Sequence, residues 1–295
     1  MKRAFKIAGL ILGLLVAIVL IGFGFVYFKT KSRFSKTYQV NVQSIPVPND
    51  SAAITLGKHV ALIKGCDECH GKDFGGNVVI DDPALGFIAG PNLTRGQGGL
   101  STRYASFSDE DYVRAIKHGL NKESKSLKLM PSYEYFPLAQ KDLGALIAYL
   151  KSLPPVNRQM PDIAVGPMGY VLTHFDKLPL VVAENIDHAG QSPEEVIPQI
   201  TPVYGKYLAV SCTGCHRVNF KGGDGLIPGS PVVPNITATG KLSNWSEKQF
   251  INTLRTGVTP EGKKLDPKFM PWKSAKEYTD IEIKSIYVYL KSLTA

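Results

Sequence analysis

Cysteine is scarce in this chain of 295 residues, which has only four. All four lie in two short stretches, so none is left for a disulfide framework elsewhere in the fold. Acidic residues are missing from residues 1–36, which hold seven of the 34 basic residues; the remaining 27 face 25 acidic ones, so the net charge of +9 comes largely from the N-terminus. No stretch of useful length alternates polar and apolar residues, so we expect a mostly helical protein.

The two cysteine-containing stretches are Cys66-Asp67-Glu68-Cys69-His70 and Cys212-Thr213-Gly214-Cys215-His216. C-x-x-C-H is the attachment signature of c-type haem, in which both thiols bond the porphyrin and the histidine becomes the proximal iron ligand. A zinc site, a redox dithiol or a disulfide would also accept a C-x-x-C pair, but none of them requires histidine next. Because histidine follows both pairs, the sequence predicts two covalently bound haem c groups, with His70 and His216 as iron ligands.

An uncharged run covers residues 7–28 and ends in several aromatic residues. At 1.5 Å per residue its 22 residues span about 33 Å, enough for the hydrocarbon core of a bilayer. We expect an uncleaved transmembrane anchor after a cytoplasmic segment 1–6, followed by a linker over residues 29–50; the alternative is a cleaved signal peptide. We expect the basic residues after the anchor to contact anionic lipid headgroups; the alternative is that they belong to a solvated linker.

The rest of the chain contains an internal repeat. Its corresponding segments are Gly57-Lys58 and Gly205-Lys206, residues 91–94 and 234–237, residues 108–119 and 246–257, and residues 128–131 and 268–271. Both copies end in Tyr-Leu-Lys-Ser-Leu, at residues 149–153 and 289–293. The repeat predicts two domains, 51–155 and 201–295, joined by a proline-containing connector, 156–200, that packs on both.

Each copy resembles a class I cytochrome c domain in the order of its helices, haem motif and methionine loop. The resemblance implies an all-α fold of two tandem class I cytochrome c domains behind an N-terminal transmembrane helix. It also implies haem-site roles for the residues Pro91, Pro234, Asn92, Asn235 and Trp245. The proline carbonyls would accept the histidine N–H, and Trp245 would donate to a haem propionate.

Two methionines occupy equivalent places in the repeat, Met130 and Met270, each followed by proline. We predict them as the distal iron ligands; the alternative is that each only packs in the core. Histidine and methionine together fill both axial positions of an iron, which then transfers electrons and does not bind substrate.

Charge is unevenly distributed between the copies. Residues 51–155 carry 12 basic and 11 acidic groups (+1), and residues 201–295 carry 13 and 7 (+6). Five lysines surround the second methionine: Lys263, Lys264, Lys268, Lys273 and Lys276. By the resemblance, the haem edge opens near this loop, so the lysines would steer an acidic redox partner to the second domain. The alternative is a solvated lysine-rich loop. We expect no nucleic-acid partner.

Both copies together resemble the cytochrome c subunits of periplasmic sugar and alcohol dehydrogenases, which commonly carry three haems where this chain has two motifs. The prediction is a membrane-anchored dihaem electron carrier rather than an enzyme. Because bacteria attach c-type haem outside the inner membrane, the haem domains would lie in the periplasm behind a single-pass anchor. The alternatives are a dihaem enzyme of peroxidase type with one open iron position, or the electron-transfer subunit of a dehydrogenase complex.

Overall fold

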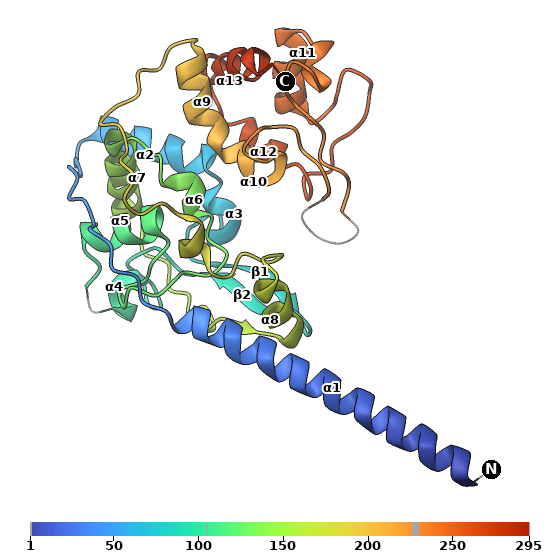
Figure 1. Ribbon diagram of the computed structural model, residues 1–295. Coiled ribbons are helices and arrows are strands. Elements are labelled where there is room, and N and C mark those ends of the chain that lie inside the picture. The colour runs from blue at the N-terminus through green and yellow to red at the C-terminus, as the bar shows by residue number, and fades with distance from the viewer. Residues whose placement is uncertain (1, 105, 226–229, 295) are drawn as a thin grey trace.

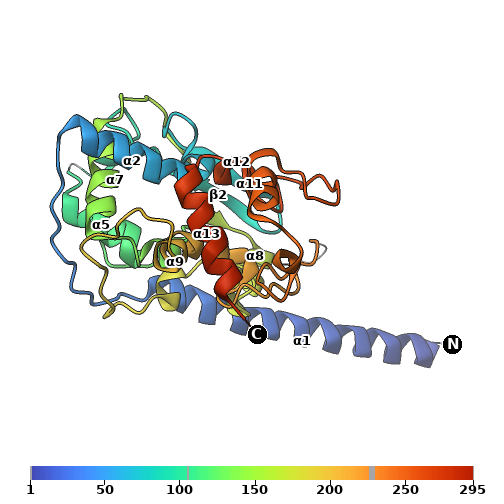
Figure 2. The same cartoon turned by 90° about the horizontal axis from the view of Figure 1, so that it is seen from above.

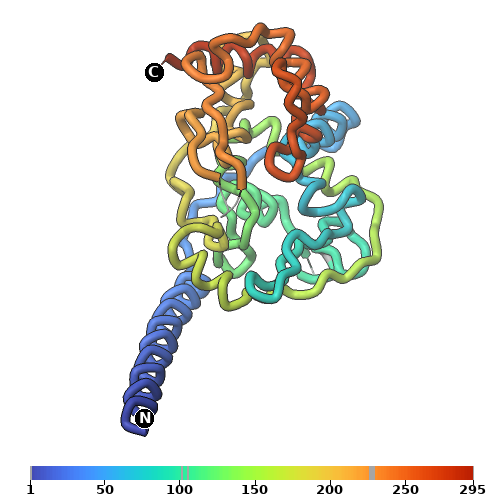
Figure 3. The backbone as a smooth tube through the Cα atoms, turned by 90° about the vertical axis from the view of Figure 1, so that its right-hand side faces the viewer, coloured from blue at the N-terminus to red at the C-terminus, as the bar shows by residue number. Residues whose placement is uncertain are grey.

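A long N-terminal helix carries a globular body made of two helical lobes (Figure 1). The computed structural model describes residues 2–104, 106–225 and 230–294. The long helix is α1 (Lys2–Ser35), and residues 36–50 then run without a helix to the body. We call residues 51–155 the first lobe and residues 201–295 the second lobe. Viewed from the side, the second lobe lies at the end of the body far from α1 (Figure 3).

Each lobe is built from short helices. Those of the first lobe are α2 (Ser51–Ile63), α3 (Cys66–His70), α4 (Leu100–Arg103), α5 (Asp109–His118), α6 (Ser132–Tyr135) and α7 (Gln140–Ser152). Those of the second lobe are α9 (Pro202–Ala209), η2 (Val210–Cys212), α10 (Thr213–His216), η3 (Lys241–Ser243), α11 (Glu247–Thr256), α12 (Trp272–Ala275) and α13 (Asp280–Ser292). The connector holds β3 (Ala164–Val165), α8 (Pro167–His174) and η1 (Val182–Asn185).

The first and last helices of each lobe cross closely, and Figure 2 shows α2 against α7 and α9 against α13. A glycine on the first helix of each pair permits this approach. A Cβ at Gly57 would lie 1.9 Å from the carbonyl oxygen of Ala145, and one at Gly205 would lie 1.9 Å from that of Ser285. Each crossing buries its own apolar cluster, one around Leu143 and Ile147 and one in the second lobe around Ile283.

The ends of the middle helices follow the local sequence. Ser108 and Asp111 form a capping box at the start of α5, and Ser246 and Gln249 form the equivalent box of α11. Both helices end on glycines in the left-handed conformation. A further capping box begins α13, formed by Thr279 and Glu282.

The mostly helical prediction is confirmed, but a small antiparallel sheet departs from the all-α expectation. Its order is β1 (Asn77–Asp82), β2 (Gly86–Gly90) and β3. All but one residue of β1 are exposed, so this strand has no alternation of buried and exposed positions to mark it in the sequence. Its partner β2 is completed by β3 from the connector, through the pairs Gly86 with Val165 and Phe87 with Ala164. The sheet is therefore a product of tertiary contact.

The segment between α1 and the first lobe is packed on the body. Helix α1 continues to Ser35, beyond the predicted end of the anchor at residue 28, and it packs on α8. Arg33 donates to the carbonyl oxygen of Thr173 at 2.8 Å and forms ion pairs with Asp176 and Glu184 at 2.6 and 2.7 Å. Ile45 in the following segment is buried in the first cluster. Helix α1 is thus fixed to the body rather than flexibly tethered to it.

Candidate haem-attachment sites

The two C-x-x-C-H stretches adopt matching turns although their helices differ in length. In both, the residue after the histidine has positive φ: Gly71 at 81° and Arg217 at 67°. The histidine carbonyl then accepts a backbone hydrogen bond, from Gly76 at 2.8 Å in the first site and from Gly222 at 3.0 Å in the second. A non-glycine residue with positive φ carries backbone strain, which the surrounding contacts at Arg217 hold in place.

Each motif histidine is oriented by one carbonyl. His70 Nδ1 lies 2.9 Å from the carbonyl oxygen of Pro91, and His216 Nδ1 lies 3.0 Å from that of Pro234. A carbonyl only accepts, so Nδ1 carries the proton and Nε2 keeps its lone pair. Burial lowers the pKa of both rings, which keeps them neutral. A neutral imidazole with a fixed Nδ1–H and a free Nε2 is the form that binds a metal.

All four motif cysteines are free thiols. Burial raises the pKa of Cys66 and of Cys212 to about 12, so neither is a thiolate at neutral pH. A redox dithiol or catalytic cysteine needs a lowered pKa instead. Among the described residues, no group of three or more His, Cys, Asp and Glu side chains comes together as a metal site. The two cysteine pairs therefore do not converge on one zinc ion.

The methionine loops repeat each other in backbone geometry. Pro131 has φ −79° and ψ 55°, and Pro271 has φ −76° and ψ 58°. The carbonyl of Met130 accepts from Ser132 N at 2.8 Å, and that of Met270 accepts from Trp272 N at 2.7 Å. Both methionines are partly buried, one beside each apolar cluster. The cluster of each lobe thus has a thioether at its edge.

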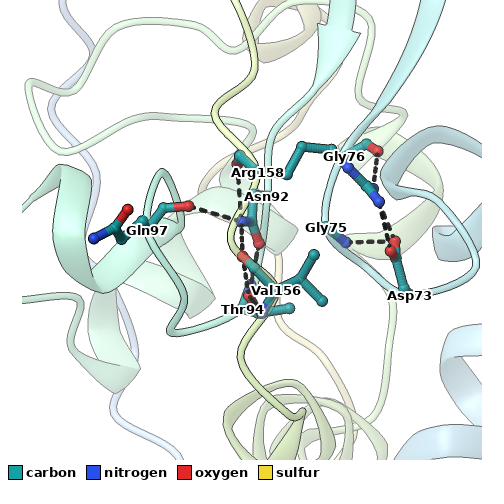
Figure 4. A network of polar contacts seen from close by, with 8 residues as sticks. All are labelled: Asp73, Gly75, Gly76, Asn92, Thr94, Gln97, Val156 and Arg158. Carbon is teal, nitrogen blue, oxygen red and sulfur yellow. Dashed lines mark hydrogen bonds and ion pairs between the residues drawn. The ribbon is translucent and has the colours of Figure 1, made fainter.

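Asn92 and Asn235 fold the loops that supply the two proline carbonyls. The side-chain oxygen of Asn92 accepts from both the N–H and the hydroxyl of Thr94, and that of Asn235 does the same with Thr237. The Asn92 amide also donates to the carbonyl of Val156 at 2.7 Å, in the network that Figure 4 draws. Both asparagines act through the loop backbone and set the position of the carbonyl that orients the histidine.

Trp245 lies at the start of α11, and its indole N–H donates to Glu261 at 3.1 Å. Two phenylalanines that the sequence did not single out lie four residues after the two motif histidines. Phe74 and Phe220 both have positive φ, and each meets a tyrosine of the last helix edge-on with ring centroids 5.7 Å apart, Tyr149 and Tyr289. This equal spacing from the two motif histidines is the sequence signal that could have identified both phenylalanines.

These donor sets fit a covalently bound haem. Each site offers two neutral thiols, an imidazole whose Nε2 has no hydrogen-bond partner among the described residues, and a methionine at the same cluster. Close packing also brings the sheet to the first site, where a Cβ at Gly90 would lie 2.0 Å from the carbonyl oxygen of Cys69.

Comparison with known proteins agrees with this chemistry. Residues 203–294 match the sequence model of the family described as Cytochrome c, so the second lobe is a cytochrome c domain. Curated relatives include a nicotinate dehydrogenase subunit of Pseudomonas putida, 26% identical over 82% of this chain and 21% of its own length. They also include the cytochrome c subunits of the quinone alcohol dehydrogenase of Gluconacetobacter polyoxogenes and of the gluconate 2-dehydrogenase of Pantoea cypripedii. These are 26% and 25% identical, each over 83% of this chain, which spans 56% and 60% of their length.

Proposed function

We propose that this chain is a dihaem electron-transfer protein that passes electrons singly between redox partners and carries out no substrate chemistry of its own. The observation that carries the proposal is the duplication of one geometry: the histidine Nδ1 on a proline carbonyl, at 2.9 Å in one lobe and 3.0 Å in the other. The relatives that cover most of the chain include cytochrome c subunits of dehydrogenases, which supports the same role.

In this proposal the residues hold and tune two haem groups. Cys66, Cys69, Cys212 and Cys215 would bond them, and His70 and His216 would bind their irons through Nε2. Met130 and Met270 would supply the second protein ligand of each iron. A haem iron held by histidine and methionine supplies a one-electron couple of raised potential without an open position. The proline carbonyls keep each imidazole at a fixed angle, which limits the reorganisation that accompanies electron transfer.

The experiment that tests this function is the haem content and spectrum of the purified protein. We expect two covalent haems per chain, both low-spin in either redox state. The peroxidase-type alternative predicts one high-spin haem that binds carbon monoxide on reduction. Finding that haem, or finding one haem per chain, would remove the carrier proposal.

The proposed location is the bacterial inner membrane, with both lobes in the periplasm. Among the described residues, α1 is the one helix long and apolar enough to cross a bilayer. Arg33 holds its last turns to α8 and to the segment after α8, so the helix supports the body as well as anchoring it. Native protein should need detergent for extraction. Recovery of mature protein whose N-terminus begins after Phe28 would show a signal peptide instead.

The proposed docking surface for an acidic redox partner is the loop around Met270. Its five lysines, Lys263, Lys264, Lys268, Lys273 and Lys276, are all exposed, and none forms an ion pair with another described residue. Steering by such charges weakens as the Debye length falls from about 30 Å at 0.01 M salt to about 10 Å at 0.1 M. Changing Lys264, Lys268 and Lys273 together to glutamate should slow partner oxidation at low salt and flatten its salt dependence. Unchanged rates would show that the lysines form only a solvated surface and do not dock a partner.

A dehydrogenase subunit remains the second candidate because several relatives carry that name. Co-purification from membranes, followed by identification of the bound chains, separates the two. A catalytic chain that stays bound in constant ratio supports the subunit role, and isolation of the cytochrome alone supports a free carrier.

A further inference from the structure

The two lobes meet through a pseudo-two-fold interface in which equivalent residues of the repeat exchange contacts. His59 and Tyr207 each lie two residues after a repeat glycine, and Asp142 and Glu282 each lie twelve residues after a loop methionine. Tyr207 donates to Asp142 at 2.5 Å across the interface, and His59 Nε2 lies 2.8 Å from Glu282 across it in the opposite direction. A two-fold interface places the same pair of positions in contact on both sides of its axis, as these two pairs are.

A second crosswise exchange involves the haem motifs themselves. Glu134 and Ser274 each lie four residues after their loop methionine, and Gly214 and Glu68 are the third residues of the two C-x-x-C-H motifs. The Glu134 carboxylate lies against Gly214, where a Cβ would be 2.4 Å from its Oε1, and the Ser274 hydroxyl donates to Glu68. In each lobe, the short helix that follows the loop methionine (α6 or α12) therefore contacts the attachment motif of the other lobe.

Glycine at the third position of the second motif makes this approach possible. Gly214 has no positive φ that would demand glycine, yet a Cβ there would lie 2.4 Å from Glu134 Oε1. A neighbouring contact also runs from the first lobe to the second. Lys64 is buried and lies two residues before the first motif, and its Nζ donates at 2.9 Å to the hydroxyl of Ser211, the residue before the second motif.

We propose that Glu134, contributed by the first lobe, is a positioning residue of the second haem site, where it holds the Gly214 position of the attachment motif across the lobe interface. This inference rests on the proposed function, because it presumes a haem on each motif. Its consequence is reciprocal contact between the sites: the loop that carries one methionine touches the segment that bonds the other haem. The two lobes then act as one electron-transfer unit, not as independent domains on a linker.

Removing the side chain and removing only its charge have different expected effects. Glu134→Ala loses the contact with Gly214, so the Soret circular dichroism and the reduction potential of the second haem should both change. Glu134→Gln keeps a side chain of the same size against Gly214, so the dichroism should recover. The potential measured above pH 7, where the Glu134 carboxyl is ionised, should still rise, because a nearby carboxylate favours the oxidised, more positive iron. The matched control, Ser274→Ala, should alter the first haem and leave the second unchanged.

Gly214→Ala tests the same contact from the other side. Its methyl group would displace the Glu134 carboxylate, so this variant should reproduce the effect of Glu134→Ala. The double variant should be no worse than either single one, and such non-additivity identifies a direct contact. Additive effects would show that the two residues act separately.

The measurements are spectroelectrochemical titration, which resolves the two potentials, and Soret circular dichroism on the full-length protein. The second haem is assigned as the one whose spectrum changes in Met270→Ala. Wild-type haem content is measured first: a value other than two per chain removes the proposed function. With two haems present, the inference is overturned if Glu134→Ala and Glu134→Gln both leave the second haem at wild-type values, or if Glu134→Ala shifts both haems equally.

Discussion

The contact between His59 and Glu282 predicts a specific dependence of stability on pH. His59 Nε2 lies 2.8 and 3.0 Å from the two carboxylate oxygens, with its side chain 28% exposed and that of Glu282 7% exposed. The hydrogen bond that His59 donates to Glu282 raises the pKa of His59 above its ordinary value of 6.5, although burial opposes the shift. The folded chain therefore binds this proton more tightly than the unfolded chain.

The direction in which stability changes with pH follows from this difference in proton binding. The stabilisation is fully present below about pH 6.5, the unfolded pKa, and is lost as the pH rises through the higher folded pKa. A hydrogen bond between charged groups contributes about 1.5–3 kcal/mol, and partial exposure of the histidine reduces this to about 1–2 kcal/mol. Glu282 keeps hydrogen bonds from Thr279 and Tyr204 when the histidine is neutral, so the loss is a weakening and not a collapse of the interface.

The perturbation is His59→Gln, whose amide still donates to Glu282 but cannot ionise. Urea unfolding of the holoprotein between about pH 5.5 and 8.5 gives the difference in stability between wild type and variant, which cancels the titration of other groups, including Glu134 with its pKa of about 7. That difference should be largest at low pH and approach zero at high pH. Tyr207→Phe is the matched control, because it removes the equivalent contact and has no ionisation in this range. A difference that is constant across the range would refute the reasoning.

Three further outcomes are expected. Arg33→Ala removes the hydrogen bond from α1 to the Thr173 carbonyl of α8 and the ion pairs with Asp176 and Glu184, so amide exchange in α8 should quicken while Lys29→Ala leaves it unchanged; equal protection in both variants would contradict the docking of α1 through Arg33. Gly57→Ala places a methyl group 1.9 Å from the Ala145 carbonyl oxygen and should cost about 1–3 kcal/mol of stability, measured by denaturant unfolding; a neutral result would mean that the helices part easily. Met270→Ala should produce one high-spin haem of lowered potential that binds carbon monoxide, and an unchanged spectrum would show that Met270 is not an iron ligand.

Local sequence was sufficient for the features that depend on neighbouring residues. The capping boxes at Ser108 and Ser246 depend only on local sequence, because a side chain three residues away closes each of them. The mostly helical character followed from the lack of any stretch of useful length that alternates polar and apolar residues. The motif histidines could be matched to the prolines Pro91 and Pro234 only through a family resemblance, and the structure now supplies that geometry.

What the tertiary structure alone decided lies in contacts between distant parts of the chain. Arg33 meets Glu184, 151 residues away, and His59 meets Glu282, 223 residues away. The strand β1 had no alternating pattern because it is exposed, and it became visible only with its partners in place. A side chain on a helix surface has the same local sequence signal whether it faces water or another lobe. The repeat therefore revealed two similar lobes, but their crosswise packing, with Glu134 on the second haem motif, depends on how the folded surfaces fit together.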